Sequence, residues 1–440
     1  MSGPIRVLAL AYTDSYVKWG ASVLDRMPAG WSRGLAVLTT PAAPSGAQLD
    51  SALAGTGTSP DDALPVSLAG LTERIRSERP DAVLLALRGP VVRVAVRAIL
   101  AAGALDPGFR RPALFSGMPG ITVPARPKAI HYRAQTDLIV LHSEREREEF
   151  TATAAQLGIE PFFALATLGF LPQRPADARP GGAADAFAGG DLVFAAQAKV
   201  PKEREQRLEL LGWLADAART APERRVIVKV RALGDEAQTH EERWDYPSLL
   251  SELPDAPANL VVEAGPMAEH LARAGGLVTV SSTAALESIG MGVPTLVLGD
   301  FGVSHRMINA VFEGSGVIGG ADDLRAGRAF HAAEDWLARN YFHAAEAEDW
   351  IAALEALVAQ RRAEGLPARR PTAGTLGGAL RQAWDRKRAL GHLDRSLAGT
   401  AAEAVGLPLR GLVRLARRLA RRLAPPAAQT SIDSPTASRA

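Results

Sequence analysis

The sequence predicts an α/β fold with two Rossmann-like, doubly wound domains that face a cleft, followed by a C-terminal helical extension. Short apolar runs alternate with amphipathic stretches through two successive parts of the chain, which is typical of parallel sheets covered by helices on both faces. A segment rich in Pro, Gly and Ala, residues 171–190, separates the two parts. The chain also has 440 residues, more than one ordinary hydrophobic core supports.

Residues 1–170 are predicted to form the first domain. Its expected strands are RVLALAY (6–12), LAVLTT (35–40), DAVLLALR (81–88), ALFSG (113–117) and DLIVLHS (137–143). Amphipathic stretches such as 67–79 and 90–103 lie between them and predict helices. Side chains that follow the strands are expected at one edge of the sheet, where open α/β sheets bind their ligands.

Residues 171–190 are predicted to be a linker, and residues 191–325 the second domain. Its expected strands are DLVFAAQ (191–197), RRVIVKVR (224–231), NLVVEAG (259–265), GLVTVSS (276–282), PTLVLGD (294–300) and SGVIGG (315–320). These runs again alternate with helical patterns, so a second parallel sheet is expected.

The rest of the chain is predicted to be helical over residues 326–400, with a basic amphipathic helix at 401–424 and a disordered tail at 425–440. In the basic helix, leucines recur at spacings of three and four while arginines occupy the other positions. Two interpretations stay open: peripheral contact with an anionic membrane, or packing of the leucines on the protein itself.

Composition excludes several classes of function. The 50 basic and 48 acidic residues leave a formal charge of +2, which argues against a nucleic-acid partner. The absence of cysteine excludes disulfides, thiolate metal sites and a cysteine nucleophile. No apolar run approaches the roughly 18 residues of a membrane span, and the first one is too short for a signal peptide. We expect a cytoplasmic protein, with the inner face of the membrane as a further site of attachment.

The stretch VSSTAALESIGMGVPTLVLGD (280–300) carries the strongest functional signal. Ser281, Ser282 and Thr283 stand where a strand ends and a helix begins, so their hydroxyls could join the helix amides in binding a phosphate. Glu287 follows one turn later and could accept hydrogen bonds from ribose hydroxyls. The alternative is an ordinary Ser/Thr cap with a surface glutamate.

This stretch resembles the donor site of GT-B glycosyltransferases. The paired serines are similar to those of the capsule-type branch, which includes polysialyltransferases and Kdo transferases. A longer pattern, from residue 5 to 320, resembles a family of bacterial candidate glycosyltransferases. It is carried by TDSYVKW, SGMPGITVPARPKAIHYRAQTDLIVLHSERE, FAAQAKVP, VIVKVRALGDEAQTH and DFGVSHRMINAVFEGSG. The resemblance implies transfer of a sugar from a nucleotide-sugar to a capsule-type or other cell-envelope glycan, or to a lipid-linked acceptor.

On the donor side, Lys229 and Arg231 lie at alternate positions of VKVR and are expected on one face of a strand, where they could neutralise a phosphate. A strand-end salt bridge is the alternative. Capsule-type transferases usually carry a basic residue followed by His-Pro here, and its absence leaves the nucleobase open. Gln197 and Lys199 are expected to face the cleft, with ordinary capping as the alternative.

On the acceptor side, Asp14 follows the first strand and is the leading candidate for the base that takes a proton from the acceptor hydroxyl. His131 is the second candidate, and a helix N-cap is the alternative role for Asp14. Further residues are expected to contact the sugar or the acceptor: Ser15, Arg88, Gly117, Gly120, His240, His305 and Asn309.

The sequence predicts no metal and no cofactor, with the nucleotide-sugar as substrate. No Asp-x-Asp stands in a loop, and the adjacent Asp322 and Asp323 are interpreted as a helix cap. Neither a Gly-x-Ser-x-Gly elbow nor a Gly-x-Gly-x-x-Gly turn after the first strand is present. A sugar-nucleotide epimerase of the same architecture and a non-catalytic glycan- or nucleotide-binding protein remain as alternatives.

Overall fold

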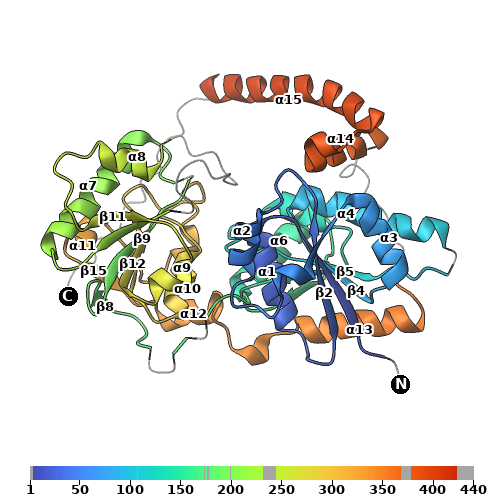
Figure 1. Cartoon of the computed structure of the whole chain (residues 1–440), viewed down its shortest axis with the longest axis horizontal. Coiled ribbons are helices and arrows are strands. Elements are labelled where there is room, and N and C mark those ends of the chain that lie inside the picture. Colours follow the sequence, from blue (N-terminus) through green and yellow to red (C-terminus); the bar gives the residue numbers. More distant parts are fainter. Residues whose placement is uncertain are drawn as a thin grey trace, which may run out of the picture. The chain divides into compact units, whose positions relative to one another are not determined.

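The structure is a computed structural model that describes residues 3–106, 108–172, 174–175, 178–198, 200–230, 244–367 and 378–423. It divides into two compact units, Met1–Thr372 and Ala373–Ala440. The first unit holds both sheets, and the second is helical. Figure 1 shows the elements of each unit.

The first domain is built on one sheet of seven strands, all parallel. They are β1 (Arg6–Ala11), β2 (Ser32–Leu38), β3 (Ala63–Val66), β4 (Ala82–Ala86), β5 (Ala113–Ser116), β6 (Leu138–Leu141) and β7 (Phe163–Leu165). Their order is β3-β2-β1-β4-β5-β6-β7, so the chain winds outward in both directions from β1. The predicted doubly wound domain is confirmed; β3 and β7 are strands that the sequence patterns missed.

The helices of the first domain connect these strands. They are α1 (Asp14–Asp25), α2 (Gly46–Leu53), α3 (Leu68–Glu78), α4 (Gly89–Ala101), α5 (Pro127–Arg133) and α6 (Glu144–Gln156), with short 3₁₀ turns η1 (Pro60–Asp62) and η2 (Ala102–Leu105). All five residues of β4 are buried, as expected for a strand covered on both faces. The carboxyl ends of β1, β4 and β5 lead into α1, α4 and the loop before α5.

The second domain repeats this pattern around β9. Its strands are β8 (Ala183–Asp185), β9 (Asp191–Ala195), β10 (Val226–Lys229), β11 (Leu260–Glu263), β12 (Ala274–Thr279), β13 (Thr295–Leu298), β14 (Ile318–Gly319) and β15 (Arg328–Phe330). Strands β9 to β14 pair in parallel, whereas β15 and β8 add an antiparallel edge. The predicted linker, 171–190, therefore contains a strand, since β8 pairs with β15.

The second domain's helices are shorter, apart from the first. They are α7 (Arg204–Thr220), α8 (Tyr246–Ser251), α9 (Met267–Leu271), α10 (Ala284–Gly290) and α11 (Ala321–Arg325), with a 3₁₀ turn η3 (Ala310–Phe312). Helix α10 follows β12 directly through residues 280–283, as the sequence predicts for the serine stretch.

The chain then returns to the first domain through α12 (Glu334–Arg339), η4 (Ala345–Ala347) and α13 (Trp350–Ala363). Helix α13 packs against β5, β6 and β7. Before it, an Asp349 carboxylate oxygen accepts a hydrogen bond from the amide of Leu165 at 2.6 Å. At its end, Arg361 pairs with Asp81 at 2.9 Å. The sequence predicts helices here but not the return.

The second unit contains α14 (Ala379–Leu390), η5 (Gly391–Leu393) and α15 (Leu397–Leu423). Helix α15 includes nearly all of the predicted basic helix, and Trp384 of α14 lies against its Gly406. Leu409 and Leu412 are 56% and 63% exposed. Among the described residues, no helix is both long enough and apolar enough to span a membrane. The predicted disordered tail lies outside the described residues.

Candidate functional site

The loop between β12 and α10 is held in place by its own hydroxyl groups. The hydroxyl of Thr279 donates to the carbonyl of Ala195 at 3.0 Å and accepts from the amide of Ser282 at 3.1 Å. The hydroxyl of Ser282 accepts from the amide of Ala284 at 3.2 Å. The Ser282 hydroxyl therefore binds an amide at the start of α10, as a helix cap does. The capping alternative thus accounts for one of the three hydroxyls of residues 281–283.

Ser281 has no such explanation. It is 4% exposed, and its hydroxyl has no hydrogen-bond partner in the described part of the chain. Its carbonyl accepts a hydrogen bond from Gln197 Nε2 at 2.9 Å, while Gln197 Oε1 likewise has no partner there. A buried polar group without a partner costs about 1–3 kcal/mol. Two such atoms beside one peptide group indicate a place prepared for a polar ligand.

Lys229 lies on the same edge of the second sheet. It ends β10, is 9% exposed, and pairs in register with Ala195 of β9, which neighbours β12. Since adjacent strands are about 4.8 Å apart, the Lys229 backbone stands roughly 10 Å from the serine loop. The predicted phosphate-binding cation is thus two strands away. Arg231, Lys199 and His240 lie outside the described residues.

Two contacts join this loop to the first domain. Gly120 has a φ of +97°, and a Cβ added to it would lie 3.0 Å from Thr283 Oγ1. One turn further along α10, Glu287 Oε2 lies 3.4 Å from Lys18 Nζ of α1. The predicted ribose-binding carboxylate therefore has a lysine partner that the sequence patterns missed. Lys18 lies one helical turn after Asp14, a spacing that could have pointed to it.

The carboxyl edge of the first sheet gathers aromatic and charged side chains around Asp14. Asp14 is the first residue of α1 and accepts from the Ser15 hydroxyl at 3.4 Å. The rings of Tyr12 and Tyr16 have centroids 5.6 Å apart. Burial raises the pKa of Tyr12 to about 12; the charge of Arg88 opposes this shift, while Tyr16 and Asp14 add to it. Asp14, Ser15 and Arg88 therefore belong to one group of side chains.

Arg133 of α5 fixes the strand ends of this edge, and no sequence pattern singled it out. Its guanidinium donates to the carbonyls of Leu87 and Gly117 at 3.2 and 2.9 Å and to Ser116 Oγ at 3.1 Å. Burial lowers the pKa of Arg133, an effect that Tyr16 opposes. A single side chain thus joins the ends of β4 and β5.

Gly117 is explained by packing. A Cβ added there would lie 2.6 Å from Cζ2 of Trp19, a fully buried residue of α1. His131 is half-buried in α5, and its Nδ1 has no hydrogen-bond partner among the described residues.

Asn309 and His305 share a loop of the second domain. Asn309 is fully buried; its Oδ1 accepts from the amide of Ser304 at 3.0 Å and its Nδ2 donates to the carbonyl of Gly302 at 3.1 Å. Its amide group therefore holds the loop, whereas His305 is exposed.

The aspartate pair at 322–323 forms a cap, as predicted. Asp323 Oδ2 accepts from the amide of Gly320 at 3.0 Å, and Asp322 pairs with Arg325 at 3.0 Å. Within the described ranges, no group of three or more His, Cys, Asp or Glu side chains could hold a metal ion.

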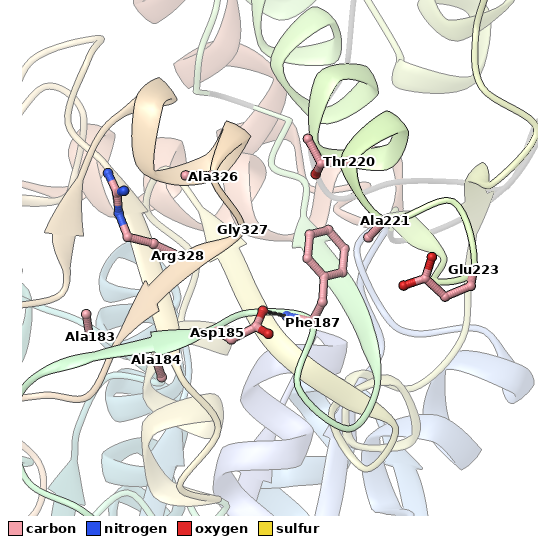
Figure 2. Close-up of a pocket in the computed structure, with 10 residues that line it drawn as sticks. All are labelled: Ala183, Ala184, Asp185, Phe187, Thr220, Ala221, Glu223, Ala326, Gly327 and Arg328. Atoms are coloured by element: carbon pink, nitrogen blue, oxygen red, sulfur yellow. Dashed lines mark hydrogen bonds between the residues drawn. The ribbon is translucent and has the colours of Figure 1, made fainter.

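A pocket of about 510 Å³ lies elsewhere, at the amino edge of the second sheet (Figure 2). The end of α7, which leads into β10, forms part of its wall, so it faces away from the serine loop. Figure 2 shows Phe187, Glu223 and Arg328 around it, without a convergent set of catalytic groups. We do not assign the reaction to this pocket.

Two doubly wound domains and a C-terminal helix that returns to the first define the GT-B class of fold, as predicted. The chain belongs to the family described as "Putative glycosyltransferase (DUF6716)", whose family model matches residues 7–357. It is a glycosyltransferase by family. No curated protein matches the sequence.

Several solved structures are similar to this chain. A "putative UDP-N-acetylglucosamine 2-epimerase from Listeria monocytogenes" has 13% identity and a TM-score of 0.50, with 84% of this chain and 100% of that chain covered. A Neisseria meningitidis UDP-GlcNAc 2-epimerase bound to UDP-GlcNAc has 11% identity and a TM-score of 0.47, with 73% and 89% covered. Phytolacca americana UGT2 has 13% identity and a TM-score of 0.43, with 83% and 96% covered. At these identities the likeness concerns the fold alone.

Proposed function

We propose that the protein transfers a sugar from a nucleotide-sugar to a capsule-type or other cell-envelope glycan, or to a lipid-linked acceptor, without a metal or a cofactor. The observation that carries this proposal is the pair of unpartnered polar atoms, Ser281 Oγ and Gln197 Oε1, at the carboxyl edge of the second sheet. Membership of a glycosyltransferase family supports it.

In this proposal the second domain holds the donor. The hydroxyls of Ser281, Ser282 and Thr283 bind its phosphate, and Lys229 neutralises the charge that develops as the nucleotide departs. Glu287 accepts from the ribose hydroxyls once Lys18 has released it. The cations Lys199 and Arg231 are proposed to add to the positive charge that binds the phosphate.

The first domain then supplies the acceptor chemistry. Asp14 takes the proton from the acceptor hydroxyl, with His131 as the alternative base. Arg88, Ser15 and Gly120 border the acceptor. In the second domain, His240 and His305 contact the transferred sugar, and Asn309 shapes the loop that carries His305.

The basic helix α15 suits a peripheral contact with an anionic membrane at its inner face, because Leu409 and Leu412 are exposed beside Arg410. Co-sedimentation of the full chain with vesicles tests this. Binding to vesicles that contain phosphatidylglycerol, but not to neutral ones, is expected. L409E/L412E should weaken it, and equal binding to both vesicle types would contradict it.

The donor site is tested by thermal unfolding of the full chain with CMP, CDP, UDP and GDP. One of them is expected to raise the midpoint, and the shift should shrink in S281A and S282A. S251A is the matched control, since among the described residues the hydroxyl of this exposed serine, the last residue of α8, donates to the carbonyl of Ser248. No shift with any nucleotide would overturn the proposal.

The epimerase remains as a second candidate because the Listeria protein of the same fold is described as one. Release of free nucleotide distinguishes the two reactions. A transferase releases it only when an acceptor is present, whereas an epimerase interconverts the sugar without acceptor. Nucleotide binding with neither reaction would favour a non-catalytic binding protein.

A further inference from the structure

Arg133 is a buried cation without a carboxylate partner among the described residues. It is 3% exposed; its guanidinium donates to three carbonyls and to the hydroxyl of Ser116, and the side chain of Tyr16 is a further hydrogen-bonding neighbour. Arg111 offers a contrast, since it is 8% exposed and bonded to both carboxylate oxygens of Asp137, at 2.7 and 2.9 Å. Carbonyls satisfy the protons of a guanidinium but do not neutralise its charge. Burying such a charge costs several kcal/mol unless an anion compensates it.

Two further cations belong to the segments that Arg133 joins, Arg88 next to Leu87 and Lys128 in α5 itself. Arg88 stands between Leu87, whose carbonyl Arg133 binds, and Gly89, which touches the ring of Tyr132. Lys128 precedes Tyr132 by four residues in α5, so both lie on the helix face toward the start of α4. Both cations are exposed, and neither has a carboxylate partner within the described ranges.

Two acids of α6, which packs against α5, are already engaged. Glu149 pairs with Arg145 at 3.2 Å and accepts from the amide of Ala125. Glu146 is fully buried and accepts from the hydroxyl of Tyr341 at 2.7 Å. Asp14 remains as the acid that shares the surroundings of Tyr12 with Arg88. The edge is therefore positively charged beside the proposed catalytic base.

We propose that this edge binds a phosphoryl or carboxylate group of the acceptor, and that the enzyme glycosylates a negatively charged acceptor. Arg88 and Lys128 contact the oxyanion, and Arg133 supplies a fixed, buried positive charge. The anion offsets part of the positive charge of these three side chains, and the acceptor hydroxyl is then presented to Asp14. This inference rests on the proposed transfer reaction and adds the charge of its acceptor.

Inorganic pyrophosphate and glucuronate are the probes, with thermal unfolding of the full chain as the readout. The nucleotide that stabilises the protein most is kept at saturation, so that the donor side is already filled. The same titrations are repeated with S281A/S282A, a variant that lacks the two serine hydroxyls of the proposed donor site. The test variant is R88Q/K128Q, and R76Q is the matched control because Arg76 is an exposed cation in the last turn of α3, at the opposite edge of the sheet.

Under saturating nucleotide, at least one probe is expected to stabilise the wild type and R76Q, with at least tenfold weaker binding to R88Q/K128Q. Stabilisation by pyrophosphate alone indicates that the acceptor carries a phosphoryl group, and stabilisation by glucuronate alone indicates that it carries a carboxylate. Stabilisation by neither probe, or equal stabilisation of the test variant, would overturn the inference. Failure of the donor proposal is read separately, as the absence of any nucleotide shift in the wild type. An unchanged nucleotide shift in R88Q/K128Q confirms that the variant is folded.

Discussion

The carboxyl edge of the first sheet is filled with large side chains that bind one another, whereas the serine loop at the same edge of the second sheet carries small polar side chains. In the first, Trp19 Nε1 donates to His142 Nε2 at 2.9 Å, and Nδ1 of this histidine contacts the carbonyl of Ala166 at 2.8 Å. In the second, the hydroxyl of Ser281 and Oε1 of Gln197 have no partner among the described residues.

The difference separates two uses of buried polar groups. Satisfied groups make the first edge rigid, so removing one is expected to cost stability. Unsatisfied groups already cost stability in the free protein, so removing one is expected to cost ligand affinity instead. The following variants test this contrast, from the largest expected effect to the smallest.

E146A is expected to lower the free energy of unfolding by about 3–5 kcal/mol, because three buried donors lose their acceptor. Glu146 accepts from the amides of Thr122 and His142 and from the hydroxyl of Tyr341. Urea denaturation measures the change. E148A is the control, since this exposed glutamate pairs with Arg339 and should shift stability by less than about 1 kcal/mol. Equal effects of the two substitutions would refute the contrast.

D81N is expected to cost about 2 kcal/mol, because Asp81 accepts charged hydrogen bonds from Arg361 and Arg362 at 2.9 and 2.7 Å. Burial alone would raise the pKa of Asp81. The hydrogen bonds from Arg362 and from the amide of Arg6, together with the charges of Arg362 and Arg361, outweigh burial and lower this pKa below its ordinary value.

A lowered pKa in the folded state makes Asp81 stabilising above the pKa of the unfolded chain, about 4. That stability is lost as the pH falls below 4 toward the folded pKa. Unfolding of the wild type should therefore show a decline in acid that is smaller in D81N and unchanged in D322N, whose side chain is 94% exposed. An unaltered decline in D81N would contradict the assignment.

S281A and S288A compare two buried serines of one segment. S281A should leave stability unchanged or raise it by up to about 1 kcal/mol, and weaken nucleotide binding about tenfold. S288A should cost about 1–2 kcal/mol and leave nucleotide binding intact, since the hydroxyl of Ser288 binds the Val293 carbonyl and the Thr295 hydroxyl. Denaturation and nucleotide titration of both variants measure this. The reverse pattern would mean that Ser281 is a structural residue.

The contact between Lys18 and Glu287 should contribute least to stability. Lys18 is 39% exposed, so K18M is expected to change stability by no more than about 1 kcal/mol. A double-mutant cycle with E287Q measures the coupling. Since Glu287 must leave Lys18 to bind the ribose in the proposed function, K18M should increase the affinity for the nucleotide slightly. Unaltered affinity would remove Lys18 from the donor site.

Much of the fold was predictable because buried parallel strands produce short apolar runs. The runs at 6–12, 81–88 and 276–282 match β1, β4 and β12 closely. Strands β3 and β8 were missed because they are short edge strands with exposed or half-buried positions, so they carry no continuous apolar signal. The return of α13 was missed because helical periodicity shows that a face is buried but not what covers it.

Candidate site residues could be predicted from the sequence where the pattern that marks them is local, that is, where it lies within a few adjacent residues. The serine loop and Asp14 were singled out as candidates because each follows a strand within a few residues. Arg133 and Lys18 were missed because their roles depend on contacts with distant segments, such as Leu87 and Glu287. Arginine is also so common in this chain that no single one stands out.

The return of the C-terminal segment has a consequence for synthesis on the ribosome. Trp350, Leu354 and Val358 of α13 are buried and pack toward strands that were translated much earlier. At elongation rates of about 5–20 residues per second, roughly 10–40 s separate the emergence of β7 from that of α13. During that interval the apolar surface that α13 later covers is exposed to solvent, and exposed apolar surface of this kind makes a nascent chain prone to aggregation and dependent on chaperones.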